Sequence, residues 1–581
     1  MKLCPECGRE YDNTMMFCLD DGAELLYGPA MSEPGAVATG FPSDEPQTAI
    51  LNSTAGPGEA ATRAQIQITD RTAILPTGTG DAVLKSRGHD KRRVAIPFLL
   101  ATIVIGGFFG YRYFKSSSSG PINSIAVLPF ENKSGNAESD YLSDGVAESL
   151  IYKLSQLPDL KVSPRSSVFR YKGKDIDAEK IGAELGVDAV MSGRIIQRGD
   201  NLTISVDLID VRNKKSLWGE QYERKMSDLL VTQREIATTI TEKLQLKLSG
   251  DSQQKLAKKY TNNNEAYQLY LKGQFHFAKR TNEDVLRGIE SFKNAISLDP
   301  NFALAHVGLA NSYGIMAAYG YASANENFPR TRAAVQRALA IDPDLAEAHA
   351  ANGKLLAEYE WNWAESEREF KRSIELNPNV AFTRYQFGLT LLTRQGRFDE
   401  AEHEIKQALE LEPLAVAIQA NLAGVYVFGR KYDLAIEQAL KAFELDSAHP
   451  TARFWVGFAF VAGGKYTDAI SVCESALAAD PSNQDCLQVV GYAYAKMGRR
   501  PEAEAVIRKF DEIAAKQYSV AYRPAAIYGL LGDKDKAFAA LEKSLDAHDW
   551  DIGLIKVDPF VDSLRDDPRF KDLLRRMNLT E

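Results

Sequence analysis

Hydrophobic positions recur at helical spacing through the second half of the chain, and the helical pattern itself repeats. The phrases LDP, IDP, LNP, LEP and ADP end its units and place prolines at positions 300, 343, 378, 413 and 481. The later prolines lie 35, 35 and twice 34 residues apart, whereas the first step is longer, which fits an insertion around YGYASANENFPR. Two helices per unit account for this period, with the proline closing the second helix.

Small residues occupy the same places in successive units. The clearest units carry Gly457, Gly464, Tyr466, Ala469, Ala476 and Pro481, and Gly396, Phe398, Ala401, Ala408 and Pro413. Small residues are needed where neighbouring helices approach closely, and the aromatic residue fills the gap between them. A period near 34 residues is typical of tetratricopeptide repeats. We therefore predict an all-helical tetratricopeptide solenoid of about eight repeats at 264–551 and capping helices at 552–581.

The pattern is different between residues 122 and 250. SIAVLPF is a short apolar run typical of a buried strand, and GVAESLIYKLSQL carries apolar residues at helical spacing. In NLTISVDLID, apolar and polar residues alternate from Leu202 to Leu208, as in a half-buried strand. A closing helix with Ile236, Ile240 and Leu244 on one stripe completes a predicted mixed α/β domain at 122–250.

This domain also resembles a known family. SIAVLPFENKSGNAESDYLSDGVAESLIYKLSQLPDLKVSPRSSVFRYKGK and IGAELGVDAVMSGRIIQRGDNLTISVDLIDVRNKKSLWGEQYER are similar to the TolB amino-terminal-like domain that precedes tetratricopeptide arrays in many bacterial membrane proteins. In that family the same module also follows kinase, cyclase or winged-helix regulator domains. The resemblance implies an accessory part of signalling chains and identifies no catalytic residue.

An apolar stretch precedes the α/β domain. VAIPFLLATIVIGGFFGY, residues 94–111, holds no charge over 18 residues, just enough for a helix to cross a membrane. More Lys and Arg residues precede this stretch than follow it, which predicts a single-pass protein of the bacterial inner membrane. Its N-terminus would be cytoplasmic and its C-terminal domains periplasmic or extracytoplasmic. A buried helix of a soluble domain is the alternative. Gly106 and Gly110 have the spacing that allows a homodimer of such helices.

The segments on either side of this stretch have the composition of linkers. Residues 27–90 are rich in Gly, Pro, Ser, Thr and Ala and have few aromatic residues, which predicts a disordered linker. Residues 112–121, with their run of serines, are interpreted as a second, shorter linker.

The N-terminal stretch CPECGREYDNTMMFCLDDG has the spacing of a zinc site. It contains two knuckles of the form ligand-x-x-ligand-Gly, and the predicted ligands are Cys4, Cys7, Cys18 and Asp21. Aspartate is a permissible zinc ligand, so a closed structural zinc ribbon is predicted at 1–26. The stretch resembles short zinc ribbons at the N-termini of bacterial membrane proteins, although Asp21 replaces their usual fourth cysteine. A metal-free form is the alternative.

Composition narrows the classes of partner. A net charge of -9 and an acidic N-terminal stretch give no field that attracts a phosphate backbone, so no nucleic-acid partner is expected. Only five cysteines occur, three of them in the zinc motif. Cys473 and Cys486 are interpreted as small core residues, and a disulfide between them remains open only if that region lies outside the cytoplasm.

Catalytic motifs are missing from the sequence. The seven histidines occur in no HExxH pattern, and the chain contains no GxSxG elbow and no kinase glycine-rich loop. We therefore predict that the chain is not an enzyme.

The predicted architecture favours two functions. The first is a membrane-tethered scaffold that binds protein or peptide partners in the concave groove of the solenoid. The alternative is a single-pass transducer that couples an extracytoplasmic sensing region to the cytoplasmic zinc ribbon. Asn421 is a scattered candidate for capturing a C-terminal carboxylate in the groove, but the pattern does not identify the partner.

Overall fold

The computed structural model describes residues 122–136, 139–174, 177–515 and 521–579, together with three short strands near the N-terminus. The chain divides into two compact units, residues 1–96 and 97–581. The first unit contains a three-stranded antiparallel sheet in the order β2-β1-β3. Its strands are β1 (Lys2–Leu3), β2 (Glu10–Tyr11) and β3 (Leu26–Tyr27).

The predicted membrane location is contradicted. In the described ranges, no helix combines the length and the apolar character needed to cross a membrane. The longest described helix, α10 (Ala324–Ile341), has 18 residues and carries Glu326, Arg330 and Arg337. The predicted span at 94–111, with Gly106 and Gly110, lies outside the described residues, as does the linker predicted at 112–121. The linker predicted at 27–90 also lies outside them, except for Tyr27, which belongs to β3.

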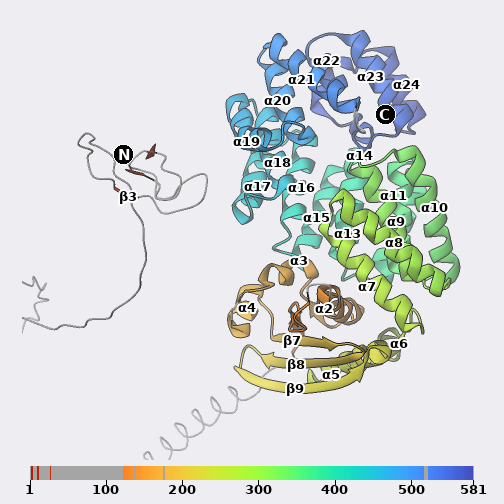
Figure 1. Cartoon of the computed structure of the whole chain (residues 1–581). Coiled ribbons are helices and arrows are strands. Elements are labelled where there is room, and N and C mark those ends of the chain that lie inside the picture. Colours follow the sequence, from red (N-terminus) through yellow and green to blue (C-terminus); the bar gives the residue numbers. More distant parts are fainter. Residues whose placement is uncertain are drawn as a thin grey trace, which may run out of the picture. The chain divides into compact units, whose positions relative to one another are not determined.

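A six-stranded mixed sheet forms the α/β domain (Figure 1). Five strands follow the order β6-β4-β7-β8-β9, and β5 pairs with β7 outside this path. Strand β4 is parallel to both of its neighbours, β6 and β7, whereas β7, β8 and β9 form an antiparallel meander. The strands are β4 (Ser124–Val127), β5 (Glu131–Asn132), β6 (Lys161–Val162), β7 (Ala189–Arg198), β8 (Asn201–Asp210) and β9 (Lys215–Lys225).

Burial in this domain follows the predicted pattern. Leu202, Ile204 and Leu208 of β8 are buried, and Ile236 and Ile240 are buried on one stripe of the closing helix. The prediction of a mixed α/β domain is confirmed. Helices α2 and α5 pack against each other and against the sheet. The helices of the domain are α2 (Asp140–Ser155), α3 (Arg165–Val168), α4 (Ala178–Leu185) and α5 (Leu229–Lys243), with 3-10 turns at Phe169–Tyr171 and Met226–Asp228.

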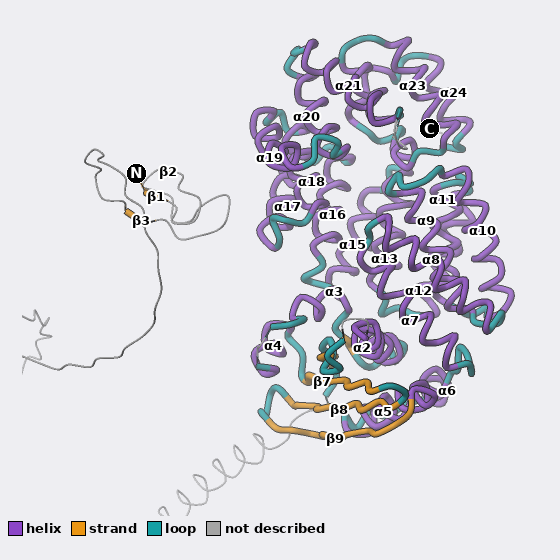
Figure 2. Tube along the Cα trace, in the orientation of Figure 1, coloured by secondary structure: helices purple, strands orange, loops and turns teal. Residues whose placement is uncertain are grey.

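Helix α6 (Gly250–Ala257) leads from this domain into the repeats, which are entirely helical in their described part (Figure 2). Eight antiparallel helix pairs follow in the described residues. The first helices are α7 (Asn264–Lys279), α9 (Ala303–Ala318), α11 (Ala346–Glu358), α13 to α14 (Ala381–Gln395), α16 (Val416–Phe428), α18 (Pro450–Ala462), α20 (Gln484–Lys496) and α22 (Tyr522–Leu530). The second helices are α8 (Asn282–Leu298), α10, α12 (Trp363–Leu376), α15 (Phe398–Leu411), α17 (Tyr432–Leu445), α19 (Tyr466–Ala479), α21 (Arg500–Ala514) and α23 (Lys534–Ala547).

The small residues of the repeat pattern lie where the pattern predicts. Ala401, Ala408 and Ala469 are completely buried between helices. Gly396 and Gly464 follow first helices with φ angles of +82° and +79°, a backbone conformation that favours glycine. The prediction of a tetratricopeptide solenoid is confirmed.

The α/β domain and the first repeats share one hydrophobic core. Ile125 and Leu150 of the α/β domain belong to the same buried cluster as Leu271 and Phe302 of the repeats. A second cluster joins the later repeats to the last residues of the chain. The α/β domain is therefore packed onto the start of the solenoid.

We predict that Gly424→Ala destabilises the solenoid. Gly424 lies in α16 against the ring of Trp455 in α18, and an added Cβ would overlap that ring. Overpacking of this kind costs about 1–3 kcal/mol, measured as the free energy of unfolding in urea by circular dichroism.

Gly314→Ala is the matched control, because a Cβ on this α9 glycine meets no atom within 4 Å. Alanine is the better helix former, so Gly314→Ala should stabilise the protein by about 0.5–1 kcal/mol. Equal effects of the two substitutions would contradict the packing described for α16 and α18.

Candidate functional site

The inner face of the later repeats carries an aromatic strip, formed by Phe428, Trp455, Phe458 and Tyr492. Neighbouring rings of the strip lie 5.4–6.3 Å apart between centroids, and all four side chains are buried. The four residues come from the first helices α16, α18 and α20, which line the concave face of a solenoid. This strip therefore lies where the predicted groove should bind a ligand.

The chain's own C-terminal segment, residues 549–565, covers the aromatic strip. The segment contains the 3-10 helices η5 (Trp550–Leu554) and η6 (Pro559–Leu564). The ring of Phe560 lies 4.9 Å from Phe458 and 4.7 Å from Tyr492, measured between centroids. The expected open groove is thus occupied over these repeats.

A buried charge network holds the other end of the C-terminal segment. Trp550 donates a hydrogen bond from Nε1 to Glu358 Oε1 at 2.9 Å. Arg394 donates from Nη2 to the carbonyl oxygen of Trp550 at 3.1 Å, and its guanidinium lies 4.7 Å from the indole centroid. Arg394 is only 1% exposed, so the tail supplies partners to a cation that water does not reach.

Contacts between distant repeats close the solenoid. Asn325 donates to the carbonyl of Asp546 at 2.8 Å, across 221 residues, and Trp363 donates to the carbonyl of Met577 at 3.0 Å, across 214 residues. The last helix, α24 (Pro568–Arg576), thus lies beside early repeats, as Figure 1 shows. In a simple solenoid each repeat contacts only its neighbours. Here the end of the chain also contacts its early repeats.

Asn421 does not offer a free amide to a ligand. Its Nδ2 donates to Tyr385 Oη at 3.0 Å and to the carbonyl of Ala417 at 2.7 Å. Its Oδ1 accepts a hydrogen bond from Trp455 Nε1 at 3.0 Å. The side chain therefore fixes the aromatic strip, and nothing in its surroundings is typical of a carboxylate clamp.

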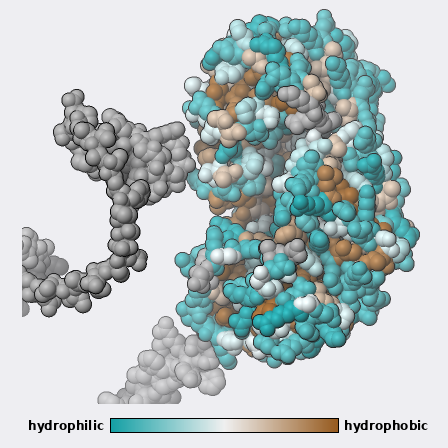
Figure 3. Space-filling view, viewed as in Figure 1, coloured by the Kyte–Doolittle hydropathy of each residue, from teal (hydrophilic) through white to brown (hydrophobic). Residues whose placement is uncertain are grey.

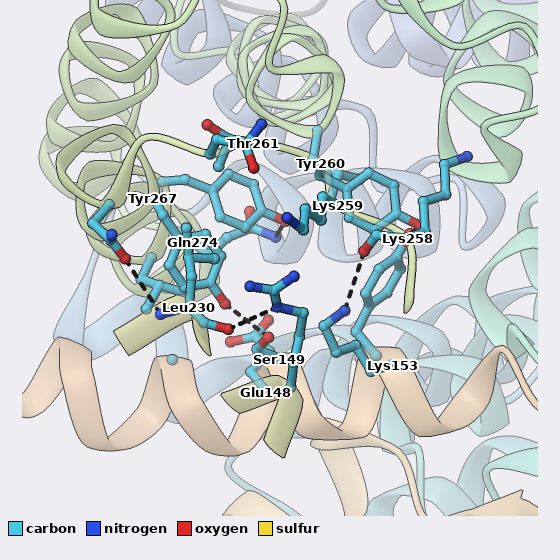
Figure 4. Close-up of a pocket in the computed structure, with 18 of the residues that line it drawn as sticks. Glu148, Ser149, Lys153, Leu230, Lys258, Lys259, Tyr260, Thr261, Tyr267 and Gln274 are labelled. Atoms are coloured by element: carbon cyan, nitrogen blue, oxygen red, sulfur yellow. Dashed lines mark hydrogen bonds between the residues drawn. The ribbon is translucent and has the colours of Figure 1, made fainter. Parts of the chain in front are cut away.

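A cavity of about 320 Å³ lies where the α/β domain meets the first repeat (Figure 4). Its walls come from α2, α5, the segment joining α6 to α7, and α7 itself. Tyr152 Oη donates a hydrogen bond to Tyr260 Oη at 3.1 Å, and Tyr267 Oη donates to Ser149 Oγ at 2.7 Å. Figure 4 shows Lys153 and Ser149 rising from α2 toward Tyr260 and Tyr267.

Two cations of this cavity have no acid beside them. Lys153 is 8% exposed, and its Nζ lies 3.4 Å from the carbonyl oxygens of Leu256 and Lys258. Arg234 Nε donates to the carbonyl of Leu230 at 3.3 Å. Across the described part of the chain, neither cation has a carboxylate at ion-pair distance. Burial and the nearby Arg234 lower the pKa of Lys153 to about 8.

Apart from Lys259, which is exposed to solvent, the other charged side chains around the cavity are paired. Glu148 lies 3.1 Å from Arg165, and Lys258 lies 2.6 Å from Asp342. These pairs neutralise each other, so the charge that faces the cavity is positive. On the face seen in Figure 3, the surface is largely hydrophilic with separate hydrophobic patches.

The predicted zinc ligands Cys4, Cys7, Cys18 and Asp21 lie outside the described residues. In the part of the chain that the structure describes, no group of three or more His, Cys, Asp or Glu side chains is placed to hold a metal. Cys473 and Cys486 are buried free thiols. A hydrogen bond from Cys473 to Cys486, together with burial, raises the pKa of the Cys473 thiol.

Comparison with protein families identifies two parts of the chain. Residues 122–239 match the family described as the second domain of HilA/YgeH-like transcriptional regulators. Tetratricopeptide repeat families match residues 390–437, 425–484 and 460–522. The chain therefore carries tetratricopeptide repeats behind an α/β domain, and repeats of this class indicate a scaffold for protein–protein interaction.

A curated relative contradicts the prediction that the chain is not an enzyme. The chain is 33% identical over 187 residues to a protein of Rhizobium meliloti (strain 1021) named putative adenylate cyclase 3. The similarity covers 32% of this chain and 32% of the relative. The absence of familiar motifs was therefore too weak a basis for the prediction. The chain spans about a third of the relative's length, and the activity in that name belongs to the whole relative.

Several solved structures show weaker similarity. PilW, a type IV pilus biogenesis factor, is 20% identical, covers 38% of this chain and 98% of its own, and gives a TM-score of 0.32. YrrB, a tetratricopeptide protein with an unusual peptide-binding site, is 20% identical over 35% and 96% of the two chains, with a TM-score of 0.24. TolB from Acinetobacter baumannii is 18% identical over 22% and 30%, with a TM-score of 0.17. Scores of this size support no further conclusion.

Sequence reasoning missed the residues that define both sites. Phe560 and Arg394 form their contacts with residues far away in the chain, so no local pattern marks them. Around the cavity a signal was present. The stretch KKYTNNNEAYQLY, residues 258–270, combines two lysines with three tyrosines at the entry to the first repeat. Basic and aromatic residues concentrated at a domain junction are typical of a binding site.

We predict that ionisation of Asp558, in the C-terminal segment, lowers the free energy of unfolding as the pH rises from about 4 to 6. Asp558 is buried and accepts hydrogen bonds from the Phe560 amide at 2.8 Å and from Tyr522 Oη at 2.9 Å. Burial raises its pKa to about 6, so the folded chain holds this proton more tightly than the unfolded chain. Its stabilising contribution is complete below the unfolded pKa, near 3.8, and is lost by about pH 6.

The measurement is the melting temperature of the wild type and of Asp558→Asn between pH 4.5 and 7. The wild type should lose stability relative to Asp558→Asn across this range. Asp567→Asn is the control, because hydrogen bonds from Arg569 lower the pKa of Asp567 to about 2, below the range tested. Parallel curves for the wild type and Asp558→Asn would contradict the burial of this carboxyl group.

Proposed function

We propose that the protein is an interaction scaffold whose aromatic strip binds an extended segment of a partner protein, in competition with its own C-terminal segment. The observation that carries this proposal is the seat of Phe560 against Phe458 and Tyr492. Grooves of helical repeats bind peptides through side-chain anchors, and here the chain provides an example of such a ligand.

The bound segment indicates what a partner would need. In the sequence DPF, an acid precedes the aromatic anchor by two residues, and Asp558 reaches Tyr522 of α22 while Phe560 reaches the strip. Arg430 also forms an ion pair with Asp562 at 2.8 Å on the rim. A partner segment with an aromatic side chain between acidic residues would use the same contacts.

The α/β domain supports a more specific role. Its family occurs as the second domain of transcriptional regulators, and a putative adenylate cyclase shares similarity with this chain. Both names describe signalling proteins. We infer that the α/β domain and the repeats form an accessory module of a signalling chain, as the resemblance to the TolB amino-terminal-like domain also implies.

We also propose that residues 1–26 bind one structural zinc ion through Cys4, Cys7, Cys18 and Asp21. The spacing of the two knuckles supports this proposal. Three thiolates and one carboxylate complete a tetrahedral site, whose role would be to hold a small fold for protein contact.

We predict that loosening the C-terminal segment exposes the groove to peptides. A labelled peptide of residues 550–564, WDIGLIKVDPFVDSL, should bind the full-length Phe560→Ala variant about tenfold or more tightly than the wild type. In the wild type the tethered segment has a high effective concentration and excludes the peptide. Fluorescence anisotropy measures both affinities.

Two controls test whether the aromatic anchor is responsible. Phe292→Ala truncates a buried phenylalanine of α8 in the first repeat, away from the aromatic strip, and this variant should bind the peptide as weakly as the wild type does. A peptide in which alanine replaces its phenylalanine should not bind Phe560→Ala. The proposal fails if the two peptides bind equally, or if Phe560→Ala gains no affinity.

Zinc content tests the N-terminal proposal. The full chain, purified without chelators, should contain about one zinc ion by mass spectrometry, and Cys7→Ser should contain none. Cys473→Ser, which changes a buried cysteine outside the motif, should retain the zinc. A zinc-free wild type after incubation with excess zinc would disprove the site.

A further inference from the structure

We propose that the cavity between α2, α5 and α7 binds a small aromatic anion, a flat ring that carries a carboxylate or a phosphate group. The cavity is separate from the aromatic strip, so this inference goes beyond the proposed function. Its volume of about 320 Å³ is at the lower end of the range for small-molecule sites. A single ring with one charged group suits that size.

The two unpaired cations indicate the charge of the ligand. Lys153 and Arg234 face the cavity from different helices and repel each other as like charges. Among the described residues, no carboxylate pairs with either of them to offset this repulsion. Burying uncompensated charges is costly unless they are paired. An anion in the cavity would offset the repulsion and replace the water that the buried Lys153 lost on folding.

The geometry of Lys153 is consistent with a missing partner. Its two contacts with carbonyl oxygens are 3.4 Å long, whereas hydrogen bonds from nitrogen to oxygen are usually about 2.7–3.2 Å. The ammonium group is thus held loosely at the wall of a cavity (Figure 4). Carboxylate and phosphate oxygens form shorter, charge-assisted bonds with such a group.

Tyrosine rings on two sides indicate the body of the ligand. Tyr152 and Tyr260 form one pair, with centroids 5.9 Å apart, and Tyr267 and Tyr270 form the other, with centroids 6.2 Å apart. All four residues line the cavity. Within each pair the two rings contact each other, and a flat ligand ring would pack against the faces or edges that the pairs turn toward the cavity. An aromatic group beside the two cations would therefore use both features of the cavity.

The position of the cavity makes the ligand a link between domains. α2 and α5 belong to the α/β domain, whereas Tyr267 and Tyr270 belong to the first repeat. A ligand bound here would contact both parts and strengthen their packing.

Calorimetric titration of the full-length protein at pH 7 tests the proposal with four probes. Phenyl phosphate and benzoate carry both ring and charge, benzyl alcohol carries the ring alone, and inorganic phosphate carries the charge alone. We expect at least one aromatic anion to bind about tenfold or more tightly than either single-feature probe. Whichever aromatic anion binds more tightly identifies the charged group.

Variants locate the binding. Lys153→Met and Arg234→Met should each weaken binding of the better aromatic anion about tenfold or more. Lys243→Met is the matched control, because Lys243 is an exposed lysine of α5 that does not line the cavity. The Lys243→Met variant should bind the aromatic anion with the same affinity as the wild type. Circular dichroism checks that each variant is folded, and Arg234→Met decides the test if Lys153→Met does not fold.

Four results would overturn the proposal. Equal affinity for benzyl alcohol and phenyl phosphate would mean that the charge contributes nothing. Equal affinity for inorganic phosphate and phenyl phosphate would mean that the ring contributes nothing. Absence of binding by both aromatic anions at millimolar concentration, or unchanged binding in the folded Lys153→Met and Arg234→Met variants, would exclude the cavity as the site.

Discussion

Phe560 fills the space between Phe458 and Tyr492 on the inner face of the repeats, and the closed form of the solenoid follows from this contact. Stacked helix pairs bury their apolar residues against each other, but an aromatic strip on the concave face has no such neighbour. The chain covers the strip with its own C-terminal segment. Once Phe560 is seated, Trp550 reaches Glu358 and Arg394, and the last helix reaches Trp363. The C-terminal region therefore combines one local aromatic fit with contacts across more than two hundred residues.

At the opposite end of the solenoid, a folded domain covers the apolar surface of the repeats. The first repeat packs its apolar surface against α2 and α5, so the α/β domain acts as the N-terminal cap of the repeats. The junction is not packed throughout, because Tyr267 and Tyr270 on one side and Lys153 on the other leave a cavity between them. A joint that serves only stability would fill this space with apolar side chains. A buried lysine beside a partly exposed arginine at the edge of a cavity is instead what a binding site requires.

Local periodicity explains how much of the fold could be predicted. The strand alternation at Leu202 to Leu208 and the small residues Ala401 and Ala469 are short-range patterns, and the structure has them as predicted. The seat of Phe560 and the burial of Arg394 arise from contacts between distant repeats, which no period encodes. Lys153 and Arg234 meet at the cavity from two different helices of the α/β domain, although they are 81 positions apart in the sequence. Neither residue stands out in its local sequence. The two contradicted predictions, membrane location and absence of enzyme function, rested on a single apolar stretch and on missing motifs.

The buried carboxyl group of Asp558 affects how strongly the C-terminal segment competes with a partner segment for the aromatic strip. A tethered segment that fits its groove perfectly would exclude every partner, because its effective concentration is far above that of a free ligand. Asp558 weakens this fit at neutral pH, since ionisation in a buried site is unfavourable. An asparagine, which keeps an oxygen acceptor without a charge, would hold the segment more tightly at this position. The acid therefore keeps the self-contact below its maximum strength, which is the condition under which a partner segment can displace Phe560 from the strip.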